Sequence, residues 1–197
     1  MKTTELICDF VGGAVGHRRR FGGGKQQDLP KALGFRGRVI PTIIDATAGL
    51  GRDAFLLASL GAKVTLIERS SDVHQLLSDG MRRAAGTNEE LAEIIGRMHL
   101  IHGDARVLLR DLAPETVLID PMHPPRAKSA LVKNEMRLLR DLVGHDPDCA
   151  ELLQTALDTA SKRVVLKWPR RGDQIPGFPA PSHQIVGKST RYDVFMR

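Results

Sequence analysis

Apolar and polar positions alternate along this chain in a pattern that predicts strands separated by helices. Short apolar runs rich in β-branched residues are typical of strands buried inside a sheet, and segments with helical spacing follow them. The apolar runs predict strands at 43–45, 63–67, 98–102, 116–119 and 163–167. The helical spacing, caps included, predicts helices at 30–33, 52–60, 70–84, 87–96, 104–112, 131–143 and 148–160.

Two further strands are expected at the end of the chain, at 183–188 and 191–196, joined by Ser189 and Thr190 as an antiparallel hairpin. Right-handed crossovers between parallel strands place helices on both faces of the sheet. We therefore expect one Rossmann-like α/β domain over 41–197, with a mostly parallel seven-stranded sheet that ends in this hairpin. Residues 1–40 are expected to form an N-terminal arm.

Polar residues mark the expected helix starts. Thr87 and Glu90 have the spacing of a capping box. Asp148 can cap the helix that follows it, and Asp104 has two compatible roles. It can cap a helix, or it can accept a hydrogen bond from a ligand such as an adenine amine.

Four acidic residues stand at the ends of four predicted strands: Asp45, Glu68, Asp104 and Asp120. Parallel strands end at the same edge of a sheet, and open α/β sheets bind their ligands beyond that edge. A carboxylate after the second strand is the position that binds ribose hydroxyls in such folds. The four acids therefore predict a nucleotide site at one edge of the sheet.

A glycine-rich turn, with Gly49 and Gly51, connects the first strand to the next helix. Glycine lets a backbone approach a ligand closely, and the helix start presents free N–H groups. With Ala54 and Glu68 the turn loosely fits a dinucleotide fingerprint, so a nicotinamide dehydrogenase is one alternative. Asp45 is a poor neighbour for a pyrophosphate, however, and a hairpin stands where a dehydrogenase would continue with another parallel strand. The cationic S-adenosylmethionine fits better, which predicts a class I methyltransferase fold.

The segment after the fourth strand, Asp120-Pro121-Met122-His123-Pro124-Pro125, is similar to the [D/N]-P-P-[Y/F] loop of amino-group methyltransferases. The lone pair of a planar exocyclic amine is delocalised into its ring, which makes the nitrogen a weak nucleophile. A carboxylate held by rigid prolines can accept the amine N–H groups and turn the lone pair toward a methyl donor. We expect Asp120, Pro121 and His123 to form this catalytic loop.

The positive net charge of the chain favours a polyanionic partner such as nucleic acid. The chain has 29 Lys and Arg against 23 Asp and Glu, a net charge of +6 and a pI near 9.7. The arm carries a cluster framed by glycines, in which a ring can stack on a base and cations can hold phosphates: His17, Arg18, Arg19, Arg20, Phe21 and Lys25. The alternative is that these charges only face water.

The remaining composition favours a cytoplasmic protein that contains no structural metal. Cys8 and Cys149 are far apart and form no CxxC pattern, which argues against a disulfide framework and a zinc site. No apolar run reaches the roughly 18 residues of a membrane span. The first residues, MKTTELICDF, lack the apolar core of a signal peptide.

Several runs together resemble the bacterial small-subunit ribosomal RNA methyltransferase J family: DFVGGAVGHRRRFGGGK, DATAGLGRDAFLLAS, IER, DPMHPPRAKSALVKNEMR, RVVLKWP and KSTRYDVF. The resemblance extends from Leu6 over nearly the whole chain. It implies an enzyme that uses S-adenosylmethionine to form N2-methylguanosine in 16S rRNA. The sequence departs from the family pattern in two places: His123 stands where phenylalanine is usual, and the chain is short at its start.

The resemblance also implies roles for individual residues. Cofactor contacts are expected from these positions: Arg52, Asp53, Glu68, Arg69, Asp104, Ala105 and Asp120. Asp45, Gly49 and Gly51 complete this set as the wall around the methionine part of the cofactor. Separately from the resemblance, Lys128 and Lys133 are expected to hold rRNA phosphates together with the arm. Lys133 shares a helical stripe with Arg137 and Arg140, for which a solvated face is the alternative. The enzyme is expected to act on the small ribosomal subunit as a monomer.

Two alternatives stay open from the residues themselves. The same loop chemistry can methylate adenine, cytosine or a protein glutamine. A protein that binds the cofactor and RNA without turnover is a second alternative, which the intact Asp120-Pro121 pair disfavours.

Overall fold

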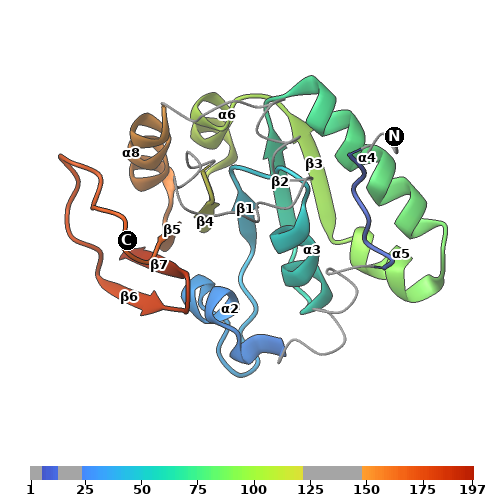
Figure 1. Ribbon diagram of the computed structural model, residues 1–197, viewed down its shortest axis with the longest axis horizontal. Coiled ribbons are helices and arrows are strands. Elements are labelled where there is room, and N and C mark those ends of the chain that lie inside the picture. The colour runs from blue at the N-terminus through green and yellow to red at the C-terminus, as the bar shows by residue number, and fades with distance from the viewer. Residues whose placement is uncertain (1–5, 13–23, 122–147) are drawn as a thin grey trace, which may run out of the picture.

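A twisted seven-stranded sheet, in the order β3-β2-β1-β4-β5-β7-β6, runs through the centre of the molecule (Figure 1). The computed structural model describes residues 6–12, 24–121 and 148–197. Its strands are β1 (Ile43–Asp45), β2 (Val64–Glu68), β3 (Met98–His102), β4 (Thr116–Ile119), β5 (Arg163–Pro169), β6 (His183–Val186) and β7 (Thr190–Met196). The predicted strands are confirmed, with β5 extending two residues further and β6 ending two residues earlier than expected.

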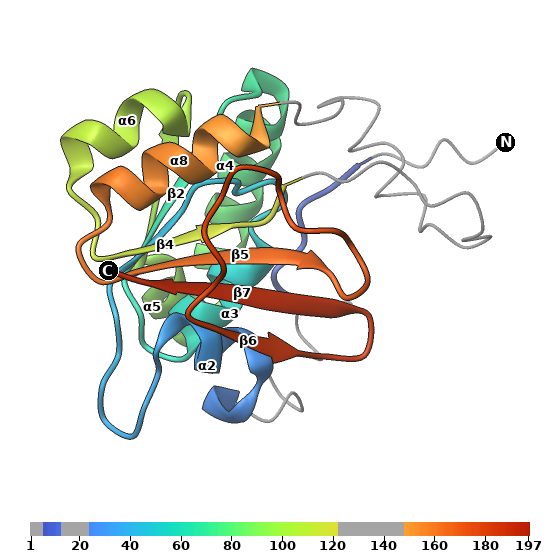
Figure 2. The same ribbon diagram turned by 90° about the vertical axis from the view of Figure 1, so that its left-hand side faces the viewer.

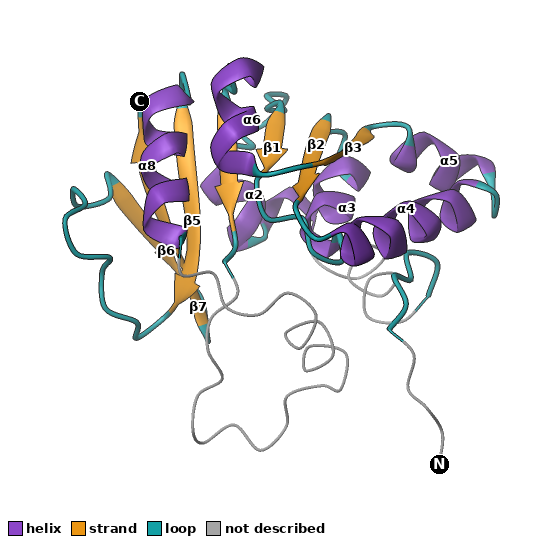
Figure 3. Ribbon diagram, turned by 90° about the horizontal axis from the view of Figure 1, so that it is seen from above, coloured by secondary structure: helices purple, strands orange, loops and turns teal. Residues whose placement is uncertain are grey.

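The pairing of the strands also agrees with the prediction. β1 to β5 pair in parallel, and only β7 pairs antiparallel with its neighbours β5 and β6. Figure 3 shows the β5–β7–β6 end of the sheet opposite the end where α4 and α5 lie beside β3. The result is a Rossmann-like sheet that ends in an antiparallel hairpin.

Helices cover both faces of the sheet (Figure 2). One face carries η1 (Gly24–Gln26), α2 (Asp28–Leu33), α3 (Arg52–Ser59), α4 (Ser71–Ala85) and α5 (Glu89–Ile95). The other carries α6 (Ala105–Leu112) and α8 (Cys149–Thr159). Because successive side chains of a strand point to opposite faces, β1, β2, β4, β5 and β7 each contribute to two aliphatic cores. In β1, for example, Ile43 belongs to the core under α3 and Ile44 to the core under α6 and α8.

The described parts of the arm join the first of these cores. Leu6, Cys8 and Phe10 are buried, and the Phe10 ring stacks on that of Phe55, with ring centroids 4.9 Å apart. The Arg83 guanidinium donates to the Cys8 carbonyl oxygen at 2.9 Å. Residues 6–12 therefore stabilise the domain against which they pack.

The packing of residues 6–12 depends on Gly80 of α4, where the Cys8 backbone approaches the helix closely. A Cβ at residue 80 would lie 2.6 Å from the Cys8 Cβ and 2.7 Å from the Cys8 carbonyl oxygen. We expect Gly80→Ala to lower the free energy of unfolding by about 1–3 kcal/mol, although alanine is the better helix former. Urea denaturation measures this change.

Gly86→Ala is the matched control, because a Cβ there meets only ordinary contacts at 3.7 Å. The explanation fails if the two variants are equally stable, since the close approach of Cys8 would then carry no energetic weight.

Two predicted helix caps differ in the structure. Asn88, and not Thr87, caps α5, because its side chain accepts from the Leu91 N–H at 2.9 Å while the Thr87 hydroxyl donates to the Arg83 carbonyl. Asp148 precedes α8 but makes no side-chain cap, because its carboxylate binds arginines instead. The Asp104 cap of α6 is confirmed.

Within the part of the chain that the structure describes, no helix is long and apolar enough to cross a membrane. The predicted helix at 131–143 lies outside the described residues.

Candidate active site

The four predicted acids lie at one edge of the sheet. Asp45 and Glu68 are the last residues of β1 and β2. Asp120 directly follows β4, and Asp104 follows β3 after one intervening glycine. The parallel pairing of β1 to β4 puts these strand ends side by side. The prediction that they meet is therefore confirmed.

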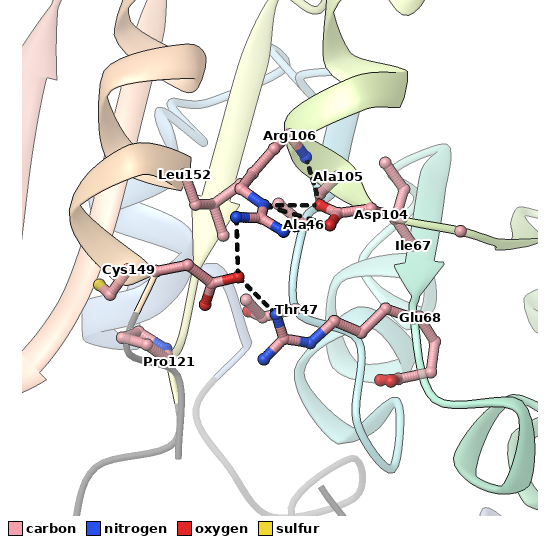
Figure 4. A pocket seen from close by; sticks show the side chains of 13 residues that line it. Ala46, Thr47, Ile67, Glu68, Asp104, Ala105, Arg106, Pro121, Cys149 and Leu152 are labelled. Atoms are coloured by element: carbon pink, nitrogen blue, oxygen red, sulfur yellow. Dashed lines mark hydrogen bonds and ion pairs between the residues drawn. The ribbon is translucent and has the colours of Figure 1, made fainter. Parts of the chain in front are cut away.

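A pocket opens at this edge, between the ends of β2 and β3 and the start of α8 (Figure 4). Apolar side chains from both layers and polar groups from the strand ends line it: Ala46, Thr47, Ile67, Glu68, Arg69, Gly103, Asp104, Ala105, Arg106, Pro121, Asp148, Cys149 and Leu152. Five of the predicted site residues thus share one pocket: Glu68, Arg69, Asp104, Ala105 and Pro121. Apolar walls with acceptors at the rim suit a nucleoside, whose ring is flat and whose sugar carries hydroxyls.

Glu68 ties the glycine turn to the next helix. One carboxylate oxygen accepts from the Gly49 N–H at 2.9 Å and the other from the Ser70 N–H at 2.8 Å. Each carboxylate oxygen can accept more than one hydrogen bond, so these contacts leave Glu68 able to bind a hydroxyl. Glu68 therefore shapes the turn as well as lining the pocket.

Gly51 has a packing role that the sequence pattern did not indicate. Its φ is +67°, and a Cβ there would lie 2.6 Å from the Leu77 Cδ1. The glycine thus lets the turn approach the core, which is a protein contact rather than a ligand contact. Gly49, with φ of +51°, also has the left-handed conformation that favours glycine.

Arginines surround the Asp104 side of the pocket. The Arg106 guanidinium contacts Asp104 at 2.6 Å and Glu151 at 2.6 Å, and Asp148 lies between Arg106 at 3.2 Å and Arg69 at 2.6 Å. Figure 4 shows this network crossing the pocket from α6 to the start of α8. The hydrogen bonds from Arg106 hold the pKa of Asp104 below its ordinary value. Asp104 is therefore an ionised acceptor that already has a strong partner.

A second group of charges adjoins the pocket: the carboxylates of Asp45, Asp53 and Asp120 around the Lys167 ammonium. The Lys167 Nζ lies 2.6 Å from an oxygen of Asp53 and 2.6 Å from an oxygen of Asp120. Asp45 is only 3% exposed, and its Oδ1 accepts from the Thr47 N–H. We call these residues the carboxylate cluster.

Burial dominates the titration of Asp45. Its pKa is raised to about 7, chiefly because the buried carboxylate loses its hydration, and the negative charges of Asp53 and Asp120 add to the effect. The Thr47 N–H and the Lys167 ammonium oppose it. The cluster therefore has more acidic than basic groups, which suits a cation near Asp45.

A hydrogen bond also fixes the backbone of Asp120, the first residue of the predicted catalytic loop. The Asp120 N–H donates to the Thr47 hydroxyl at 2.7 Å, which ties the end of β4 to the turn after β1. Thr47 and Lys167 were not predicted as site residues. A lysine that ends the apolar run RVVL in a buried strand is the signal that could have identified Lys167.

Two other predicted residues, Arg52 and Lys25, belong to the described part of the chain but do not line the pocket. Arg52 begins α3. Lys25 lies in η1, and its ammonium donates to the Gly37 carbonyl at 3.3 Å. The rest lie outside the described residues: His17, Arg18, Arg19, Arg20, His123, Lys128 and Lys133. Among the described residues, His, Cys, Asp and Glu form no group that could hold a metal ion.

The pocket and the carboxylate cluster together fit the chemical parts of S-adenosylmethionine. Ala46 and Thr47 follow Asp45 in the chain, and Pro121 follows Asp120, so the lining of the pocket is continuous with the cluster. Acceptors at the pocket rim suit ribose and adenine, while surplus carboxylates suit an ammonium and a sulfonium. A pyrophosphate would instead meet like charge here, which disfavours the dehydrogenase alternative.

Comparison with known proteins agrees with this fit. Residues 1–197 match the family described as "Putative SAM-dependent methyltransferase". A protein of Brucella anthropi named ribosomal RNA small subunit methyltransferase J is 62% identical over 195 residues, which cover 99% of this chain and 95% of the relative. A protein of the same name from Agrobacterium fabrum is 64% identical over 192 residues, which cover 98% and 92% of the two chains.

A solved structure also has this fold. The crystal structure of a SAM-dependent methyltransferase from Neisseria gonorrhoeae superposes with a TM-score of 0.77 at 40% sequence identity. The alignment covers 99% of this chain and 76% of that one.

Proposed function

Because the chain belongs to the ribosomal RNA small subunit methyltransferase J family, we propose that it methylates the exocyclic N2 of one guanosine in 16S rRNA. Family membership makes it an enzyme that depends on S-adenosylmethionine. The observation that supports the choice of an amino group is the position of Asp120, which directly follows β4, belongs to the carboxylate cluster and precedes Pro121 of the pocket lining.

Asp120 is the proposed catalytic residue, and Pro121 and His123 complete its loop. The carboxylate accepts a hydrogen bond from the guanine N2–H, which localises the nitrogen lone pair for attack on the methyl carbon. It also stabilises the positive charge that grows on nitrogen as the new N–C bond forms, and the methylated nitrogen then loses its extra proton to water. His123, in place of the usual phenylalanine, is proposed to stack on the guanine ring.

S-adenosylmethionine supplies the methyl group when bound, and its sulfur takes the electron pair of the broken bond. The residues proposed to hold it fall into two sets. Asp45 and Asp53 face its cationic end, with the turn at Gly49, Gly51 and Arg52. Glu68 accepts from the ribose hydroxyls, and Arg69, Asp104 and Ala105 line the adenine side of the pocket.

The RNA is proposed to bind through cations of the arm and of the segment after Asp120: His17, Arg18, Arg19, Arg20, Lys25, Lys128 and Lys133. Phosphate contacts of this kind position the RNA, and the target guanine has to leave its stack to reach Asp120. We further propose that the protein acts in the cytoplasm, as a monomer, on the small ribosomal subunit or its 16S rRNA.

Tritiated S-adenosylmethionine tests this function. Small subunits from a strain that lacks the enzyme should accept about one methyl group each, and nucleoside mass analysis should identify N2-methylguanosine. Subunits from the parent strain, which already carry the methyl group, are the control and should stay unlabelled. Label in methyladenosine, methylcytidine or protein would show that the enzyme methylates a different amino group. The absence of any label would support the alternative of a protein that binds the cofactor and RNA without turnover.

A further inference from the structure

β5 sends two charged side chains, Arg163 and Lys167, toward the face covered by α2 and α3. Arg163 begins the strand and donates to the Ala32 carbonyl of α2, whereas Lys167 lies near the strand end where the site is. In the register of β4 and β5, Ile119 pairs with Leu166, so Asp120 and Lys167 are the next residues along adjacent strands. Leu118 and Val165, which precede them by two positions, both lie in the core under α3. Since side chains alternate along a strand, Asp120 and Lys167 belong to that same face.

The ammonium bridges two carboxylates that come from different elements. Its Nζ is 2.6 Å from the Asp53 Oδ2 at the start of α3 and 2.6 Å from the Asp120 Oδ2 at the end of β4. The side chains are largely shielded from water: 23% of Lys167 and 12% of Asp53 are exposed, against 38% of Asp120. Asp53 therefore anchors the ammonium on the inner side, and Asp120 is the more accessible of its two partners.

The surroundings keep this lysine charged. Burial opposes the charge, but the carboxylates of Asp53 and Asp120 outweigh it and raise the pKa of Lys167 above its ordinary value. A permanent ammonium favours the ionised form of Asp120. An ionised Asp120 can only accept hydrogen bonds, which is what a donor N–H group of a base requires.

We infer that Lys167 is a positioning residue for methyl transfer: by holding Oδ2 of Asp120, it fixes the carboxylate in the orientation that receives the target amine. This inference rests on the proposed function of Asp120. The Thr47 hydroxyl holds the Asp120 backbone N–H at 2.7 Å, so Thr47 and Lys167 together fix both the main chain and the side chain of Asp120. Asp53 acts as the anchor that keeps the ammonium in place.

The test compares Lys167→Met, which removes the charge and keeps an unbranched side chain, with the conservative Lys167→Arg. Lys162→Met is the matched control, because Lys162 pairs with Glu115 at 2.7 Å just before β5, far from the site edge. We expect Lys167→Met to lower kcat about 10²-fold, while Kd for S-adenosylmethionine is unchanged or lower because the cluster loses a positive charge. The acid limb of the kcat/KM profile should move to higher pH, since Asp120 and the neighbouring Asp45 both lose a stabilising cation, while Asp53 keeps its negative charge beside them.

Lys167→Arg should restore most of kcat and return the acid limb to its original pH, and Lys162→Met should leave both unchanged. If Lys167→Met does not fold, Asp53→Asn/Lys167→Met replaces it, because the double variant removes the anchor carboxylate along with the ammonium. Because Asp53 is itself proposed to face the cofactor, kcat, Kd and the acid limb of the double variant are compared with those of Asp53→Asn alone.

Three outcomes overturn the inference: a kcat equal to that of Lys162→Met, an acid limb that stays in place, or a loss of cofactor affinity that parallels the loss of kcat. The last would show that Lys167 only supports the fold of the pocket. If the unmodified enzyme itself forms no N2-methylguanosine, the proposed function fails instead, so the two failures are distinguishable.

Discussion

Replacing Asp120 with asparagine is expected to lower kcat for methyl transfer by about 10²- to 10³-fold. Asparagine keeps the shape of the side chain but loses the charge that stabilises the growing positive charge on N2. Its amide group also offers N–H donors where the target amine needs an acceptor. The Thr47 contact should survive, because it uses the Asp120 backbone N–H. Single-turnover labelling of small subunits measures this loss.

Cofactor binding separates this effect from damage to the pocket. Kd for S-adenosylmethionine should stay within a few-fold of the original value, because Asp45, Asp53 and Glu68 remain in place. Asp158→Asn on the exposed side of α8, where Asp158 pairs with Gln154, is the matched control and should keep full activity. A fully active Asp120→Asn enzyme would remove Asp120 from the catalytic role.

Asp45→Asn is expected to remove a strong pH dependence of stability. The pKa of Asp45 is about 7 in the folded protein against an ordinary value of 3.8, mainly because the carboxyl group is buried. The folded state therefore binds a proton that the unfolded state has released throughout the window between these two values. Stability from this group is fully present below pH 3.8 and is lost as the pH rises through 7.

The shift corresponds to a loss on the order of 4 kcal/mol across that window. Urea denaturation from pH 4 to pH 8 gives the free energies of unfolding of the original protein and of Asp45→Asn. The difference between the two proteins should change with pH by this amount. Asp158→Asn, an exposed carboxylate, should show a nearly constant difference from the original protein. A constant difference for Asp45→Asn as well would show that Asp45 titrates normally.

Periodicity along the chain predicted most of the fold because the signals are local. The apolar runs that became β1 to β5 and the helix that begins at Arg52 depend on neighbouring residues only. The four acids at the strand ends could also be placed, since the parallel order of the strands brings their ends together.

Contacts between distant residues were not predictable in this way. Lys167 and Asp53 are 114 positions apart, and nothing near either residue indicates the other. Asp148 was expected to cap α8, but Arg69, 79 positions away, takes its carboxylate. The choice of Asn88 over Thr87 as the cap of α5 shows the same limit on a smaller scale, because both residues have suitable side chains and only the backbone geometry selects one.

The surplus of carboxylates beside the pocket also bears on turnover. Loss of the methyl group converts a sulfonium into a neutral thioether, so the spent cofactor carries one positive charge fewer than the fresh one. Asp45, Asp53 and Asp120 with a single Lys167 attract the charged form more strongly than the neutral one. We therefore expect the same electrostatics that bind the methyl donor to favour release of the product, which would help the enzyme exchange one for the other after each cycle.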